Sequence, residues 1–321
     1  MNVATAFRQV LKKRGIPPKS LAQVLQTLEG SALQNMREFG AREIANTLHI
    51  MAKERYTPRG HLLLAFEGRA EAISGEFDSQ GVANTLWAYA TLGRQPGEGL
   101  IRKLEGQAEG LAHAFNAQEV ANTLWATCFF SIQSSDAACR FFRALSSRQS
   151  VLELCCFEVQ ALRQMHQFLV ACDVEEGVRA RMPDSFVALK ERLGPKCQAC
   201  FVATPTQASV SQEEVSAILR GIGLSVEDEF RCPKSGYSID MRVQDRGLEG
   251  SSSSGCGVGW AVEFDGPSHF FGCTAATGAT LIKRRHLELL GYRLVSVPFW
   301  DWDRLTGSDE RKKYLRGKMH I

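Results

Sequence analysis

The chain has 321 residues, which is enough for about two domains. Its composition, 44% hydrophobic and 23% charged, is ordinary for a soluble, folded protein. The net charge of +3 gives no whole-chain argument for binding a polyanion, and no apolar run approaches the roughly 18 residues that span a bilayer.

The first 28 residues are basic and contain no Asp or Glu; their cations are Arg8, Lys12, Lys13, Arg14 and Lys19. Such a segment is compatible with an organellar transit sequence. Alternatively, Leu21–Leu28 is the first helix of the folded protein. Residues 1–39 are therefore predicted to form a helical segment that either caps the following region or serves targeting.

A repeated string dominates the next region. Val-Ala-Asn-Thr-Leu-Trp-Ala occurs at Val82–Ala88 and again at Val120–Ala126, 38 residues later, and a shorter form lies at Ile44–Leu48. Identical strings at one period indicate a supersecondary unit that is stacked on copies of itself. Residues 40–195 are therefore predicted to be a repeat array, with a degenerate last unit at Glu158–Leu162.

Each repeat is predicted to be a helical hairpin. A phenylalanine followed by a residue suited to a helix N-cap precedes each first helix, at Phe39-Gly40, Phe77-Asp78 and Phe115-Asn116. Asn116 and Glu119 have the spacing of a capping box, and Gly93 suits the end of a first helix. Pro58 and Pro96 fit the first turn of second helices at His61–Ile73 and Leu100–His113. Such hairpins build an α-solenoid with a 38-residue period.

Two polar positions recur on the first helices. Asn46, Asn84 and Asn122 lie inside a helix, where Asn is a poor former. They either form hydrogen bonds between repeats, which we favour, or face a ligand. Arg42, Gln80 and Gln118 recur at the first turn, where a side chain can reach a base edge or a phosphate, or simply face water.

The ten cysteines show no disulfide framework and indicate reduced thiols in an intracellular compartment. Cys197 and Cys200 form the single CxxC pattern. With Cys232 and Cys273 they offer a weak indication of a zinc site.

Residues 196–321 are predicted to be a small α/β domain. Ser211–Glu214 matches a capping box that opens a helix to about Arg220. Three strands, a helix and a last strand are expected at Leu224–Arg231, Tyr237–Val243, Trp260–Asp265, Ala276–Leu290 and Tyr292–Pro298. Gly250–Gly255 is predicted to be a flexible surface loop.

This order, α-β-β-β-α-β, resembles the core of the PD-(D/E)xK nuclease-like fold. The resemblance implies an acid on the second strand and two residues at i and i+2 on the third, which here are Asp240, Glu263 and Asp265. Together these could hold Mg²⁺ or Mn²⁺ against a phosphate. Asp265 replaces the usual lysine, and Lys283 on the following helix is the candidate substitute.

Basic and aromatic residues gather in the same domain. The cations are Lys283, Arg284, Arg285 and His286 on one helix and Arg311, Lys312, Lys313, Arg316 and Lys318 near the end. Such groups can neutralise phosphates. Phe270, Phe271, Trp300 and Trp302 either stack on unpaired bases or belong to the core, which we favour for Trp300. His269 follows a Gly-Pro turn beside the acids and is a further candidate.

Two stretches resemble known families. The 38-residue hairpin with Ala-Asn-Thr-Leu-Trp-Ala resembles the octotricopeptide repeat of organellar RNA-binding proteins. Val262–Phe270, with Thr280–Arg285, Leu290–Tyr292 and Val297–Trp302, resembles the RAP domain, which is also found in FAST kinase-like proteins.

These resemblances imply binding of single-stranded RNA and an RNA-associated domain with a nuclease-like fold. Our leading hypothesis is a non-catalytic RNA-binding protein of organellar RNA processing, stability or translation. The candidate RNA contacts are Arg42, Gln80, Gln118, Asn84 and Asn122 in the solenoid and His269, Lys283, Arg284 and Arg285 in the RAP domain. We expect the mitochondrial matrix, with the plastid as alternative, and partners among RNA-processing or ribosomal proteins.

No cofactor is expected unless the protein is catalytic. One rival hypothesis is a metal-dependent endoribonuclease that uses Asp240, Glu263 and Asp265 with Mg²⁺ or Mn²⁺. A second rival is a protein scaffold or a structural component of an organellar ribosome without sequence-specific RNA readout. The chain shows no Gly-rich phosphate loop, which argues against a kinase.

Overall fold

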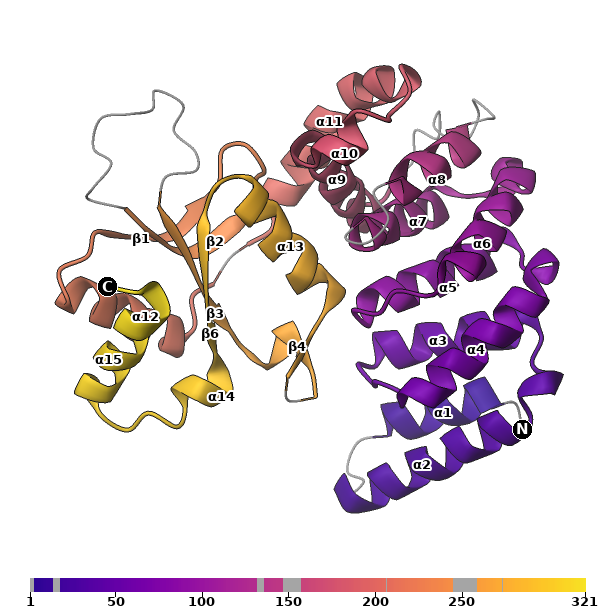
Figure 1. The fold of residues 1–321 in the computed structure, drawn as a ribbon, viewed down its shortest axis with the longest axis horizontal. Helices are drawn as coiled ribbons and strands as arrows, with labels where there is room; N and C mark the ends of the chain where they lie inside the picture. Colours follow the sequence, from indigo (N-terminus) through magenta and orange to yellow (C-terminus); the bar gives the residue numbers. More distant parts are fainter. Residues whose placement is uncertain are drawn as a thin grey trace. The chain divides into compact units, whose positions relative to one another are not determined.

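The computed structural model describes residues 3–13, 18–131, 136–146, 157–205, 207–244, 259–272 and 274–321 (Figure 1). The chain divides into two compact units, residues 1–197 with 277–279, and residues 198–276 with 280–321. The predicted loop at 250–255 and Cys273 lie outside the described residues. Over the described ranges, no helix is long and apolar enough to cross a membrane.

The first unit is built from helices. Its elements are α1 (Val3–Lys12), α2 (Pro18–Gln34), α3 (Ala41–Lys53), α4 (Gly60–Ala72), α5 (Ser79–Thr91), α6 (Glu98–Gly110), α7 (Ala117–Phe130), α8 (Ala137–Ser146), α9 (Val159–Val174), α10 (Glu176–Arg179) and most of α11 (Ser185–Val202). Single 3₁₀ turns at Met36–Glu38, Ser74–Glu76 and Ala112–Ala114 precede α3, α5 and α7. The prediction of a helical region followed by a small α/β region is confirmed.

The caps expected from the sequence start α5 and α7. The Asp78 side chain accepts a hydrogen bond from the Gly81 N–H at 2.7 Å. Asn116 and Glu119 form the predicted capping box. Gly40 is the N-cap of α3, and Gly93, with φ of 64°, follows the C-cap of α5. These local signals were therefore interpreted correctly.

The prolines do not lie in the first turns of the second helices, contrary to the prediction. Pro58 and Pro96 each precede the N-cap, because α4 begins at Gly60 after Arg59 and α6 begins at Glu98 after Gly97. Both N-cap residues have extended backbone. A proline suits the position before them because no helical hydrogen bond needs its missing N–H.

Packing in the first unit follows chain order in two layers. The first helices α1, α3, α5, α7 and α9 each contact the next, and the second helices α2, α4, α6 and α8 do the same. Figure 1 shows these helix pairs following one another from indigo to magenta. At equivalent positions Leu48, Leu86 and Leu124 are fully buried. Burial of each such side chain contributes about 1.5–3 kcal/mol.

Polar contacts between successive hairpins recur as well. The Glu29 carboxylate accepts from the Arg59 N–H at 3.0 Å, and Glu67 accepts from the Gly97 N–H at 2.8 Å. Arg69 donates to the Phe39 carbonyl at 2.9 Å, and Gln107 donates to the Phe77 carbonyl at 2.7 Å. Equivalent side chains therefore satisfy backbone groups of the neighbouring hairpin, which buried polar groups require.

Residues 1–39 were predicted to be helical and either capping or targeting. The helices α1 and α2 pack on each other, and they contact α3 and α4 respectively. Both helices are therefore packed into the helical unit, while capping and targeting stay predictions. The degenerate last unit contributes α9, whose N-cap is Glu158 and which contacts α7.

The second unit is an α/β fold. It contains α12 (Val210–Gly221), β1 (Val226–Arg231), β2 (Ser238–Val243), β3 (Trp260–Asp265), β4 (Phe270–Phe271), β5 (Ala275–Ala276), α13 (Gly278–Leu289), β6 (Arg293–Pro298), α14 (Phe299–Trp302) and α15 (Ser308–Met319). The main sheet has the order β1-β2-β3-β6. Its first three strands are antiparallel, and β6 runs parallel to β3.

One helix start differs from the prediction. The N-cap of α12 is Ser209, which forms a capping box with Gln212, and the helix begins at Val210. The predicted box at Ser211–Glu214 was therefore wrong by two residues. Both serines have the spacing of a capping box. Ser209 is the N-cap because its backbone is extended and the helix begins at the next residue.

Alternation along the strands separates an apolar from a polar face of the sheet. Met241, Val243, Val262, Val295 and Val297 form a core with α12 and α15. Trp302 belongs to this core and is 1% exposed, so it does not stack on bases. Phe270 and Phe271 are also buried, and the Trp300 ring packs on Phe270 with 4.4 Å between centroids. The opposite face carries acids and is covered by α13.

Candidate functional site

The three predicted acids lie on the same face of the sheet. Asp240 is on β2, and Glu263 and Asp265 are two residues apart on β3. Glu263 is 3% exposed and Asp265 is 1% exposed. A buried carboxylate must be paired or hydrogen-bonded, because its transfer from water is costly. The contacts of these acids therefore decide what the site can do.

Lys283 reaches the acids directly from α13. Its ammonium Nζ lies 2.5 Å from Oε2 of Glu263. The sequence predicted action from a distance, whereas the strand and helix bring the two side chains into contact. The second carboxylate oxygen of Glu263, Oε1, is buried and has no hydrogen-bond partner among the residues that the structure describes. One open acceptor therefore remains beside the lysine.

Three neighbouring side chains contact the Asp265 carboxylate. Arg284 Nη2 lies 2.6 Å from Oδ2 of Asp265, and the Ser296 hydroxyl donates to the same oxygen at 2.5 Å. His269 Nδ1 lies 3.4 Å from Oδ1. Arg284 thus points into the sheet rather than toward solvent. His269 does lie beside the acids, as the sequence indicated.

Burial dominates the protonation of the group. It raises the pKa of Glu263 to about 8, although the Lys283 ammonium opposes this shift. It also raises the pKa of Asp240, against the effects of Lys283 and of the Phe264 N–H, which donates to Asp240 at 2.8 Å. Burial lowers the pKa of Lys283, but Glu263 and Asp240 outweigh that effect, so its pKa lies above the ordinary value. Lys283 is therefore a cation at neutral pH.

The predicted metal site is not assembled. No group of three or more His, Cys, Asp or Glu side chains among the described residues is placed to hold a metal ion. The physical reason is that Lys283 and Arg284 neutralise Glu263 and Asp265 themselves. The same finding applies to Cys197, Cys200 and Cys232. The residues therefore do not fit a resident Mg²⁺ or Mn²⁺.

The basic cluster of α13 is not an open phosphate surface, contrary to expectation. Lys283 and Arg284 are paired with buried acids, Arg285 is half-buried, and His286 is fully buried with Nδ1 3.0 Å from the Tyr237 hydroxyl. Because α13 packs on the polar face of the sheet, its basic side chains point toward the buried acids. The sequence showed that basic residues cluster on this helix, but it could not show whether their side chains face the sheet or the solvent.

The predicted polar positions of the first unit divide into two groups. Arg42 and Gln80 are exposed, and Arg42 Nη2 lies 4.0 Å from the Asp78 carboxylate. Asn84 is half-buried. Gln118 instead donates to Asn122 at 2.9 Å and to Gln164 of α9 at 2.7 Å. Asn122 also accepts from Gln164 at 2.9 Å, which supports the structural interpretation at that position.

Sequence reasoning missed the continuation of this polar face onto α9. Gln160 is exposed and stands two residues after the N-cap Glu158, as Arg42 does after Gly40. Two turns further along, the rings of His49 and Trp87 lie 4.9 Å apart, and Trp125 Nε1 donates to Gln167 at 2.7 Å. Counting from each N-cap, rather than from the repeated string, would have found Gln160.

The structure thus defines a protein with a stack of helical hairpins and an α/β unit that encloses a buried cluster of acids and cations. Comparison with protein families identifies a RAP domain at residues 262–318. A second family, described as a protein of unknown function (DUF1601), matches residues 21–48, 75–86 and 112–124. Those three segments overlap α2–α3, α5 and α7.

Three curated proteins are similar to parts of the chain. A chloroplastic RAP domain-containing protein of Oryza sativa subsp. japonica is 33% identical over 106 residues, 33% of this chain and 14% of its own length. The mitochondrial FAST kinase domain-containing protein 3 of Rattus norvegicus is 42% identical over 60 residues, covering 18% and 9%. The mitochondrial FAST kinase domain-containing protein 1 of Mus musculus is 44% identical over 41 residues, covering 12% and 5%.

These matches show that the chain contains a RAP domain and that parts of it are similar to RAP domain-containing and FAST kinase domain-containing proteins. It spans no more than about a seventh of the length of those relatives.

Proposed function

We propose that the chain binds single-stranded RNA in an organelle, through the first-helix layer of its helical unit, and that it does not catalyse a reaction on that RNA. The RAP domain supports this proposal, as do relatives named for chloroplasts and mitochondria. We favour the mitochondrial matrix, with the plastid as alternative, because both FAST kinase-like relatives are mitochondrial.

The observation that carries the proposal is the polar face of the first helices. Arg42 and Gln80 occupy the same position on adjacent helices α3 and α5, and both are exposed. Stacked hairpins with one variable polar position each are the arrangement by which helical-repeat proteins contact one base per repeat. This face fits an octotricopeptide-like solenoid.

So few repeats specify only a few nucleotides. We therefore propose partners among organellar RNA-processing or ribosomal proteins, which would supply the remaining specificity. The RAP domain would add affinity or recruit such a partner.

The test is binding of the full chain to a pool of labelled single-stranded RNA over a range of salt concentrations. Arg42→Ala with Gln80→Ala should weaken binding, and the slope of log affinity against log salt should fall by about 0.7 for each phosphate that the variant no longer neutralises. The matched control is Arg102→Ala on α6, since Arg102 is also an exposed arginine with an acidic neighbour, Glu98. We expect the control to bind like the wild type.

Two outcomes would overturn the proposal. If no RNA pool shows salt-dependent binding, the chain is a protein scaffold. If bound RNA is cleaved when Mg²⁺ or Mn²⁺ is added, and cleavage is abolished in Asp240→Ala and Glu263→Ala, the protein is an endoribonuclease. The pairing of Glu263 with Lys283 and of Asp265 with Arg284 argues against the second outcome.

A further inference from the structure

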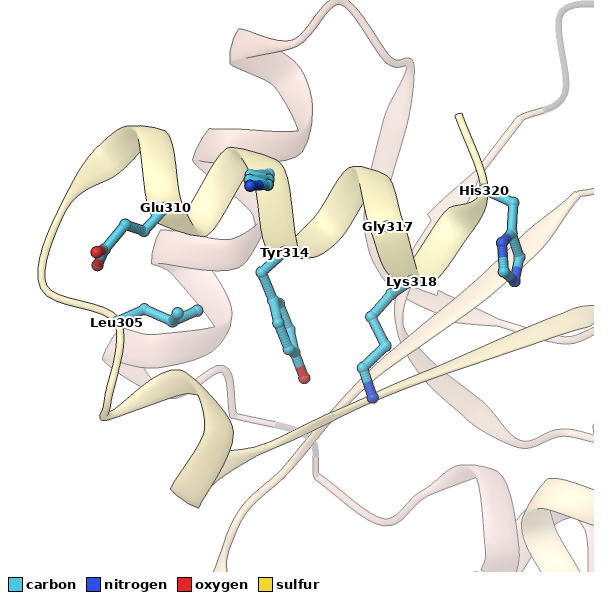
Figure 2. A pocket seen from close by; sticks show the side chains of 7 residues that line it. Leu305, Glu310, Tyr314, Gly317, Lys318 and His320 are labelled. Carbon is cyan, nitrogen blue, oxygen red and sulfur yellow. The ribbon is translucent and has the colours of Figure 1, made fainter.

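A groove of about 660 Å³ runs along one face of α15 (Figure 2). Glu310, Lys313, Tyr314, Gly317 and Lys318 line it at the helical spacing i, i+3, i+4, i+7 and i+8. Leu305 and His320 complete the lining. In an ordinary surface helix this stripe is apolar and packs on the core, whereas here it combines the aromatic ring of Tyr314, which does pack on the core, with a glutamate and two lysines. The volume lies within the range of small-molecule pockets, so one nucleotide can be accommodated.

The cations of α15 differ according to the face on which they lie. Lys312 pairs with Asp309 at 3.2 Å, and Arg311 pairs with Glu214 at 2.9 Å. Lys313 and Lys318, which line the groove, are exposed, and neither forms an ion pair with any residue that the structure describes. The acid of the groove, Glu310, already accepts from the Thr306 N–H at 3.0 Å. Two lysines against one carboxylate give the groove a net positive charge, which attracts an anion.

An aromatic ring stands between these cations and is held in place. The Tyr314 hydroxyl donates to Asp301 at 3.1 Å, and the ring meets the edge of the buried Trp302 at 6.5 Å between centroids. Figure 2 shows the Tyr314 ring and the Lys318 chain extending from the same side of α15. Because the ring is positioned beforehand, a ligand that contacts it loses little additional ordering free energy.

Lys318 currently rests on the ring, with Nζ 5.3 Å from the Tyr314 centroid. A cation–π contact at such an exposed site is weak. The flexible lysine can therefore turn to a phosphate and leave the ring to a base. Stacking of a base on an aromatic side chain beside a basic groove is how proteins bind single-stranded nucleic acid without sequence preference.

We propose that this groove is a subsite for one nucleotide of a single-stranded RNA, with Tyr314 against the base and Lys313 and Lys318 on the flanking phosphates. The inference rests on the proposed function and adds a contact in the second unit. Of the two basic clusters that the sequence indicated, the first has Lys283 and Arg284 paired with buried acids, and the second contributes Lys313 and Lys318 to the groove.

Gly317 offers a way to block the groove without disturbing the fold. A Cβ added there would meet no atom within 4 Å. Gly317→Ala should thus be tolerated, since alanine is the better helix former. Gly317→Leu should project a larger side chain into the groove and exclude a base.

The experiment measures binding of the full chain to a single-stranded RNA that carries 4-thiouridine, followed by photocrosslinking and mapping of the crosslinked peptide. Lys313→Gln with Lys318→Gln, and separately Gly317→Leu, should weaken binding about tenfold, and each should remove the crosslink to the peptide that contains Tyr314. Lys312→Gln and Gly317→Ala are the matched controls and should bind like the wild type. Thermal unfolding verifies that every variant is folded.

If the chain binds RNA while the groove variants keep wild-type affinity and the Tyr314 crosslink is absent, the subsite is wrong and the proposed function stands. If the wild type binds no RNA, the proposed function fails. The groove is then tested with 4-thiouridine monophosphate alone. Failure of this nucleotide to crosslink to the Tyr314 peptide overturns the subsite as well.

Discussion

The two units handle polar side chains in opposite ways. In the helical unit, equivalent polar contacts recur between adjacent hairpins, as at Glu29, which is buried and pairs with Arg59, and at Glu67. In the α/β unit, five ionisable groups are gathered beneath α13: Asp240, Glu263, Asp265, Lys283 and Arg284. Because the contact is repeated, each copy contributes a small part of the stability of the helical unit. Each member of the buried ionic cluster contributes more, because its removal leaves a buried charge without its partner. Mutations should therefore have larger effects on stability in the second unit.

The largest effect is expected when one partner of the buried pair is removed. At a pH above 8, where Glu263 is ionised, Lys283→Ala leaves the Glu263 carboxylate buried without its cation, which should lower the free energy of unfolding by about 3–5 kcal/mol. Urea unfolding of the full chain, followed in the second unit by near-ultraviolet circular dichroism, measures this change.

The control replaces both partners, Glu263→Leu with Lys283→Met. This variant should recover most of the stability that the single substitution removes, because no uncompensated charge remains. Equal destabilisation of the single and double variants would show that packing, rather than charge, dominates beneath α13.

An effect of similar size, on the order of 5 kcal/mol at most, is expected from pH. The folded-state pKa of Glu263 lies near 8, above its ordinary value of 4.5. Below pH 4.5 the Glu263 carboxyl is protonated in both the folded and the unfolded state, so its titration does not change the free energy of unfolding. As the pH rises toward 8, the unfolded chain releases the proton and the folded chain retains it, so stability falls.

The measurement compares urea unfolding of the wild type and Glu263→Gln across that pH range. The free energy of unfolding of Glu263→Gln should decrease less over this pH range than that of the wild type, because the amide does not titrate. Parallel curves for the two proteins would mean that Glu263 is ionised at neutral pH and fully paired with Lys283.

The smallest effect is expected in the helical unit. Asn116→Ala removes the capping box of α7 and should lower the free energy of unfolding by about 1 kcal/mol. Asp78→Ala, which removes the simpler cap of α5, should have a similar or smaller effect. Thermal unfolding of each variant tests this. A destabilisation as large as that of Lys283→Ala would contradict the contrast between the units.

Much of the local structure could be predicted from residue patterns. The N-caps Asp78 and Asn116, the strand Trp260–Asp265 and the same-face placement of Glu263 and Asp265 all depend on neighbours a few residues apart. The errors were local too: Pro58 and Pro96 lie before the N-caps, and Ser209 rather than Ser211 starts α12. In each case two nearby positions satisfied the same motif.

The candidate sites were less predictable, because side-chain direction depends on distant packing. Lys283 and Arg284 look alike in the sequence to Lys313 and Lys318, as basic residues on amphipathic helices. Packing turns the first pair toward buried carboxylates and leaves the second pair in an open groove.

The sequence by itself determined the helical hairpins, the order of helices and strands along the chain and the presence of a RAP domain, since periodicity, caps and motifs act over short distances. Only the tertiary structure decided which polar groups meet. Residues 20 positions apart, Glu263 and Lys283, form one ion pair because β3 and α13 pack face to face. The free energy of a buried charge depends on what surrounds it in space, and no short-range pattern contains that information.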